Sequence, residues 1–203
     1  MISLPKNSEV NKLLPKKLFY EKVYITSHIK QEFVEKIEKI IWKYKIAESN
    51  INVLKTEVVE EIEIFEIILK EKYNAKNILK IITKEIPYPI LFMIKYENEF
   101  QYAIKYEEDI FFTEWDNELS FSFMGLNLEK IYENIVKVIA NIEENTKSLK
   151  NELEKKQEIA KIENEIIKLE NQIRKEQQFN RKVELNKKLL ELKNEMEELN
   201  NNE

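Results

Sequence analysis

Two stretches near the end of the chain decide its architecture: IENEIIKLENQI at residues 162–173 and LNKKLLELKNEMEEL at residues 185–199. In both, apolar residues recur at alternating steps of four and three, which places them on one side of an α-helix. A stripe of this kind has to be buried against another surface, so the sequence predicts long helices that pack on a partner. The apolar positions are Ile162, Ile166, Leu169 and Ile173, followed by Leu185, Leu189, Leu192, Met196 and Leu199.

The two series are out of phase, because the interval from Ile173 to Leu185 does not continue the repeat. The break falls at residues 177–181, which include Phe179, the only aromatic residue after residue 140. An antiparallel helical hairpin explains the change of phase, and a stutter in one continuous helix is the alternative. We favour the hairpin and predict an antiparallel coiled coil over residues 143–203.

The bulk composition restricts the classes of function. The chain has 203 residues, enough for one domain with an extension. It lacks cysteine, which excludes disulfides, thiolate metal sites and a cysteine nucleophile. A single glycine argues against glycine-rich nucleotide loops. The net charge is −5 and only Arg174 and Arg181 are arginines, which lowers the expectation of nucleic-acid binding. No signal peptide or apolar membrane span is recognisable, so we expect a cytoplasmic protein without membrane contact.

The first part of the chain is predicted to be an irregular arm followed by a helix. Pro5 and Pro15 interrupt residues 1–26, which we interpret as an arm laid over the head, residues 27–142. Apolar residues at helical spacing then predict one helix from Ser27 to Tyr44. Its other side carries Lys36, Lys39 and Lys43, which are candidates for nucleic-acid contact. Interleaved glutamates favour a solvated helix face instead.

The pattern of strands and helices in the rest of the head predicts an α+β fold, with a mostly antiparallel sheet and helices packed on one face of it. A second helix begins at Asn74 and ends before Pro87, and a third begins at Asn127. The predicted strands are residues 51–54, 61–69, 90–96, 100–106, 110–115 and 119–124.

No catalytic constellation stands out, and we predict no catalytic residue, no metal ligand and no cofactor. A restriction-type nuclease needs one strand acid and then an acid–x–lysine on the next strand. The nearest residues, Glu63, Glu66 and Lys70, do not have that spacing. His28 is the only histidine and is interpreted as structural, since a lone histidine needs a carboxylate and a nucleophile beside it to act as a base.

Several motifs along nearly the whole chain resemble a bacterial family known only as domain of unknown function 4391. The most specific motif is QFNRKVELN at residues 178–186. Others are IEIFEI at residues 62–67 and IPYPILF at residues 86–92. The resemblance implies a setting beside helicases and DNA methyltransferases in restriction-like defence clusters. It implies no catalytic residue.

We therefore hypothesise a non-catalytic accessory protein that binds a helicase, methyltransferase or nuclease of a defence or mobile-element system. A homodimer through the tail is a further option. An anti-CRISPR inhibitor of an RNA-guided nuclease and a divergent metal-dependent nuclease are the alternatives. The predicted partner-binding residues are Ile166, Ile173, Phe179, Arg181 and Leu189.

Overall fold

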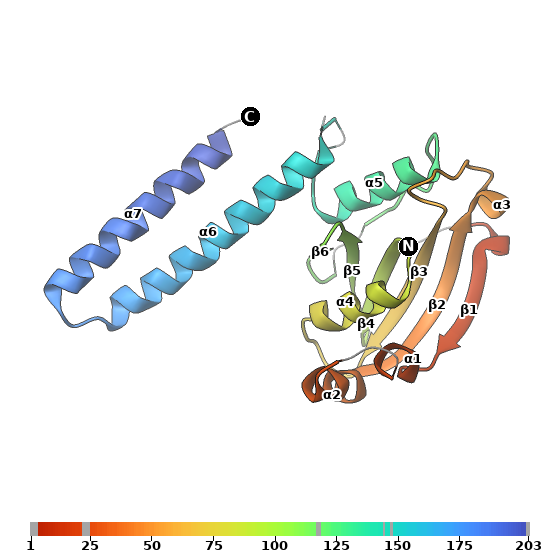
Figure 1. Cartoon of the computed structure of the whole chain (residues 1–203), viewed down its shortest axis with the longest axis horizontal. Coiled ribbons are helices and arrows are strands. Elements are labelled where there is room, and N and C mark those ends of the chain that lie inside the picture. Colours follow the sequence, from red (N-terminus) through yellow and green to blue (C-terminus); the bar gives the residue numbers. More distant parts are fainter. Residues whose placement is uncertain (1–3, 22–24, 117–118, 144, 147, 202–203) are drawn as a thin grey trace. The chain divides into compact units, whose positions relative to one another are not determined.

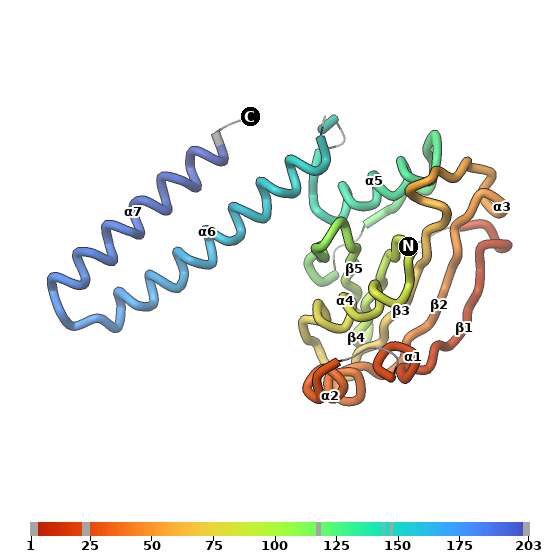
Figure 2. Tube along the Cα trace, viewed as in Figure 1, coloured from red at the N-terminus to blue at the C-terminus, as the bar shows by residue number. Residues whose placement is uncertain are grey.

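The computed structural model divides into two compact units, Met1–Glu144 and Asn145–Glu203, called here the head and the tail. The head is an α+β unit built on one sheet, and the tail consists of two helices (Figures 1 and 2). The structure describes residues 4–21, 25–116, 119–143, 145–146 and 148–201.

The head sheet has six strands in the order of the sequence. Adjacent strands are antiparallel, except for β3 and β4, which are parallel. That exception follows from α4 (Lys76–Glu85), the crossover helix that a parallel pair needs. The strands are β1 (Glu9–Leu14), β2 (Ile37–Ala47), β3 (Glu61–Leu69), β4 (Ile90–Tyr96), β5 (Glu99–Tyr106) and β6 (Asp109–Phe112).

The main core lies between one face of this sheet and three helices: α1 (Lys17–Tyr20), α2 (Ser27–Glu35) and α4. Side chains alternate between the faces of a strand, so Phe65, Ile67 and Leu69 of β3 all point into this core. In the first half of the strand, Ile62 and Ile64 on the other face are buried as well, as its nearly continuous apolar sequence predicts.

The second face of the sheet is covered at one end by α5 (Leu128–Ile139), which contacts β3, β5 and β6. Asn127 caps this helix by accepting a hydrogen bond from the Lys130 backbone N–H at 2.8 Å, as the sequence predicts. Helices therefore lie on both faces of the sheet, and the prediction of one covered face is wrong. The residues of the second face that are buried at the α5 end include Ile46, Ile62, Ile64, Leu91 and Ile104.

The predicted helix from Ser27 to Tyr44 is also wrong, because the chain leaves α2 at Glu35 and enters β2 at Ile37. Irregularities interrupt the β2–β3 register between Ile37 and Lys39 and again between Trp42 and Tyr44. A bulge shifts the alternation of side chains by one residue. Across the first irregularity, the buried residues Ile37 and Ile40 are therefore three positions apart, which imitates a helical period.

Other local predictions also fail. Part of the predicted arm at residues 1–26 is the edge strand β1, which pairs with β2. The predicted strand at residues 51–54 is instead the end of α3 (Glu48–Ile51) and a loop. Residues 119–124 form no strand, and β6 pairs with β5 through a turn at Glu107 and Glu108.

The tail consists of α6 (Leu149–Lys175) and α7 (Phe179–Asn201), which pack together. The chain changes helix at residues 176–178 and reverses direction there (Figure 1), close to the predicted break. An ion pair joins Glu170 of α6 to Lys193 of α7 at 3.0 Å. Among the described parts of the chain, no helix combines the length and the apolar character needed to cross a bilayer.

Candidate functional site

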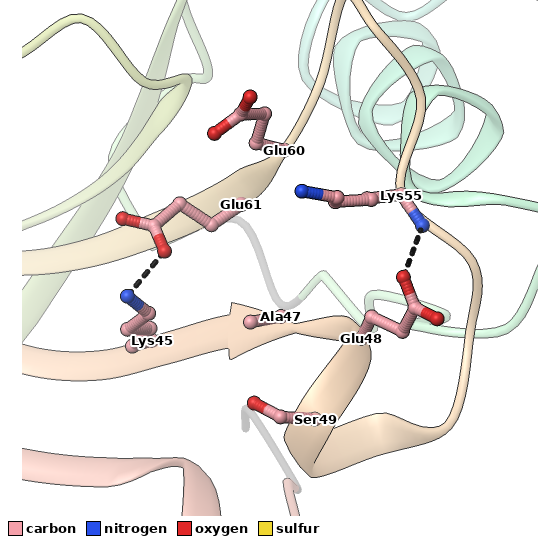
Figure 3. Close-up of a pocket in the computed structure, with 7 residues that line it drawn as sticks. All are labelled: Lys45, Ala47, Glu48, Ser49, Lys55, Glu60 and Glu61. Carbon is pink, nitrogen blue, oxygen red and sulfur yellow. Dashed lines mark hydrogen bonds and ion pairs between the residues drawn. The ribbon is translucent and has the colours of Figure 1, made fainter.

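A pocket of about 470 Å³ opens beside the end of β2 and the start of β3. The side chains around it carry both signs of charge, which gives the pocket hydrogen-bond donors and acceptors. Figure 3 shows Lys45 and Glu61 on neighbouring strands and Lys55 entering from the loop that follows α3. The lining residues are Lys45, Ala47, Glu48, Ser49, Lys55, Glu60 and Glu61.

Two polar contacts organise this pocket (Figure 3). The Lys45 ammonium forms an ion pair with the Glu61 carboxylate. The hydrogen bond that Lys45 donates to Glu61 within this ion pair raises the pKa of Lys45 above its usual range, although partial burial opposes the shift. The Glu48 carboxylate accepts a hydrogen bond from the Lys55 backbone N–H at 3.4 Å. Of the charged side chains around the pocket, Lys45 and Glu61 are therefore paired with each other, and the Glu48 carboxylate is held by a backbone N–H.

Glu63 lies two residues after Glu61 in β3, on the same face of the sheet. It is paired with Lys45 in the β2–β3 register. Its side chain is only 3% exposed, and its Oε2 atom has no hydrogen-bond partner. Burial, and then the charge of Glu61, raise the pKa of Glu63 to about 7. Two carboxylates thus compete for one lysine, and the inner one is held close to its titration point at neutral pH.

The sequence did not predict the Lys45–Glu61–Glu63 group. Lys45 followed a stretch interpreted as helix, so nothing in the sequence placed it beside β3. The alternation of charged and apolar residues at the start of β3 identified Glu61 and Glu63 as strand residues, but it could not show that one of them is buried.

The acids and lysine considered for a nuclease site do not come together. Glu63 and Glu66 are an odd number of residues apart in β3, so they face opposite sides of the sheet. Lys70 lies just after the strand and donates to the Val34 carbonyl at 2.8 Å. His28 lies in the first turn of α2, with Nε2 3.4 Å from a Glu32 carboxylate oxygen. Within the described residues, no three acid or histidine side chains gather closely enough to hold a metal ion.

The three lysines considered for nucleic-acid contact do not share a helix face. Lys36 ends α2 and pairs with Glu71 across the fold. Lys39 lies in β2 and pairs with Glu38 at 3.1 Å, and Lys43 occupies the second register irregularity of β2. The basic stripe expected at this position is therefore absent, because the helix that would have carried it is a strand.

The five predicted partner-binding residues of the tail divide into two groups. Ile166 is buried and Ile173 and Leu189 are half-buried, on the sides where α6 and α7 pack together. Phe179 is 78% exposed at the start of α7, and Arg181 is exposed with its guanidinium Nε 3.5 Å from Glu176. The second group is therefore more exposed than the first.

A further, mostly apolar surface lies on the head, on the part of the second sheet face that α5 does not cover. Adjacent strands align Leu13, Ile41, Glu66 and Met93 across β1 to β4, with Ile68 beside them. Leu13 is 61% exposed and the other four are half-buried. These five residues are called here the open face. Four of the five side chains are apolar, and apolar side chains gathered on a protein surface mark a candidate binding site.

The fold defines an α+β protein that carries a paired-helix extension. A family model described as a domain of unknown function, DUF4391, matches residues 2–196, and the chain belongs to this family. No curated protein and no solved structure shows significant similarity to the chain.

Proposed function

We propose that the protein is a non-catalytic accessory protein whose head docks on a larger nucleic-acid-processing enzyme of a bacterial defence or mobile-element system. The observation that carries this proposal is the open face. It combines exposed Leu13 with half-buried Ile41, Ile68 and Met93 at the end of the sheet that α5 does not cover. Apolar side chains held on a rigid sheet can be buried by a partner without reordering the head.

The charges around the open face suit a protein partner better than a nucleic acid. Glu66 lies in its centre, between Ile41 and Met93 in the strand register. A phosphate backbone would be repelled by this carboxylate, whereas a protein surface with an apolar centre and mixed charges would fit it.

A docking test changes the open face without disturbing the core. Leu13→Lys with Met93→Lys puts cations at one exposed and one half-exposed position, the second beside Glu66. We expect this variant to lose at least about tenfold in affinity for the partner, because two apolar anchors are replaced by charges. The measurement is co-purification from the native host, with the captured proteins identified by mass spectrometry.

The control is Leu126→Glu, which charges an apolar residue of the head that is exposed outside the open face. It should retain the captured partner. Capture of a helicase, methyltransferase or nuclease that is lost only in the open-face variant supports the proposal. Equal capture by all variants contradicts it, and so does metal-dependent cleavage of DNA or RNA by the purified protein, which would favour the divergent nuclease.

For the tail, we propose that α6 and α7 form an antiparallel coiled coil that acts as a rigid extension. The alternating steps of three and four residues and the burial of Ile162 and Ile166 support this packing. In an antiparallel pair, Leu169 and Leu192 lie on facing sides, and both line one groove of the tail.

Engineered cysteines test this pairing directly, because the natural chain has none. We expect Leu169→Cys with Leu192→Cys to form an intramolecular disulfide on mild oxidation, since facing positions bring the two Cβ atoms close. The readout is the shift in gel mobility on reduction, with Leu169→Cys and Leu190→Cys as the mismatched control. Efficient closure of the control pair alone would rule out the proposed packing.

A further inference from the structure

Helix α7 carries a second apolar stripe that α6 does not cover. The stripe consists of Phe179, Val183 and Leu190, each more than half exposed. At 100° per residue, these three positions fall within an arc of about 40°. The side of α7 that packs on α6 is centred about 140° away around the helix axis, so one neighbouring helix cannot bury both sides. We call these three residues the outer stripe.

The charges of α7 are sorted along its length. Residues 179–190 contain four cations and one carboxylate, whereas residues 191–201 contain one cation and four carboxylates. No acidic residue lies in the first turn and no basic residue in the last. This order is the reverse of what the helix macrodipole favours, so it does not stabilise an isolated helix.

Helix α6 does not compensate for this polarity. Both halves of α6 carry lysine and glutamate in similar numbers, so its charge is nearly balanced along its length. The partner that complements a helix basic at one end and acidic at the other is a helix of the same sequence running in the opposite direction.

We propose that two copies of the chain associate through the outer stripe of α7, with the two α7 helices antiparallel about a two-fold axis near Leu190. A two-fold interface uses the same patch on both subunits. The basic and acidic halves of α7 meet at Leu190, so an axis there places opposite charges beside each other. Leu190 of each copy then packs against its equivalent. Val183 and Phe179 then lie against the acidic half of α7 in the other copy. This association does not depend on the docking of the head.

The proposed axis pairs specific charges. Lys182 lies eight residues before Leu190 and Glu197 seven residues after it. At 100° per residue, Glu197 falls at the angle of Phe179, on one edge of the outer stripe, and Lys182 lies about 60° beyond that same edge. In the antiparallel arrangement, Lys182 of one copy therefore lies beside Glu197 of the other, and the pair occurs twice. A parallel arrangement would instead bring like charges together at both ends.

A charge exchange tests both the surface and the direction. We expect the full chain to dimerise in sedimentation equilibrium, and Lys182→Glu or Glu197→Lys alone to weaken the dimer at least about tenfold. The double variant Lys182→Glu with Glu197→Lys should recover to within about threefold of the wild type, because each pair is restored with its signs reversed. Recovery by a second change cannot be attributed to misfolding.

Leu190→Lys tests the apolar part of the interface and should abolish dimerisation. Its matched control is Ile167→Lys, which charges a similarly exposed residue of α6 outside the outer stripe and should leave the dimer intact. Far-ultraviolet circular dichroism should show the same helix content in all variants. A monomeric wild type, a double variant no tighter than the single variants, or equal loss in the Ile167→Lys control would each overturn the proposal.

Discussion

Replacing Phe65 with alanine should destabilise the head by about 3–5 kcal/mol. Phe65 lies in the central part of the sheet and is only 2% exposed. Its ring packs edge-on against Phe92 at 6.3 Å between centroids and tilted against Trp42 at 6.5 Å. Truncation would remove these contacts and leave a cavity that the neighbouring strands cannot collapse to fill, because they are held by ladders on both sides.

The measurement is urea unfolding followed by tryptophan fluorescence, which reports on the head because both tryptophans, Trp42 and Trp115, lie in it. The control is Val58→Ala, a change at a residue of the head that is mostly exposed. It should cost less than about 0.5 kcal/mol. A Phe65→Ala midpoint that coincides with that of the control would mean that the aromatic cluster does not hold the sheet together.

The residues that could be predicted from sequence are those whose local pattern and tertiary environment agree. Strand β4 matches its predicted bounds, Ile90–Tyr96, because turn residues define both of its ends. Helix α5 begins at its predicted cap, because Asn127 and the apolar spacing after it both favour a helix that starts at this position. The α6 and α7 stripes are long enough for their period to be unambiguous.

The failures occur where a tertiary contact overrides or disguises the local pattern. Strand β2 was predicted as helix because its register irregularities give the buried residues Ile37 and Ile40 a spacing of three. Strand β1 contains no clear alternation because it is an edge strand, mostly exposed on both faces. Neither feature can be recognised before the pairing partner of the strand is known.

The candidate sites divide in the same way. A single period accounts for the side of α7 that packs on α6, so that side was predictable. The outer stripe was not, because Phe179, Val183 and Leu190 become significant only when α6 is seen to leave them uncovered. The Lys45–Glu61–Glu63 group depends on two strands in register, which the sequence did not predict.

The last prediction concerns the pH dependence of stability that Glu63 imposes on the head. Its pKa is raised from 4.5 to about 7 in the folded protein, first by burial and then by the charge of Glu61. Between these two values the folded state binds more protons than the unfolded state. The stabilisation is therefore fully present below the unfolded pKa and is lost as the pH rises through the folded pKa. Across this whole pH window, the free energy of unfolding falls by about 3 kcal/mol.

Glu63→Gln should remove this dependence, because the amide has nearly the shape of the protonated carboxyl group and does not titrate. Between about pH 6 and about pH 8.5, we expect the wild type to lose about 1.4 kcal/mol more than Glu63→Gln in urea unfolding. The control is Glu66→Gln, on the opposite and half-exposed face of β3, which should lose as much as the wild type. Parallel curves for the wild type and Glu63→Gln would mean that Glu63 reaches water or finds a partner in solution. In that case Glu61 and Glu63 would not be competing for Lys45, and the electrostatic account of the pocket would have to be replaced.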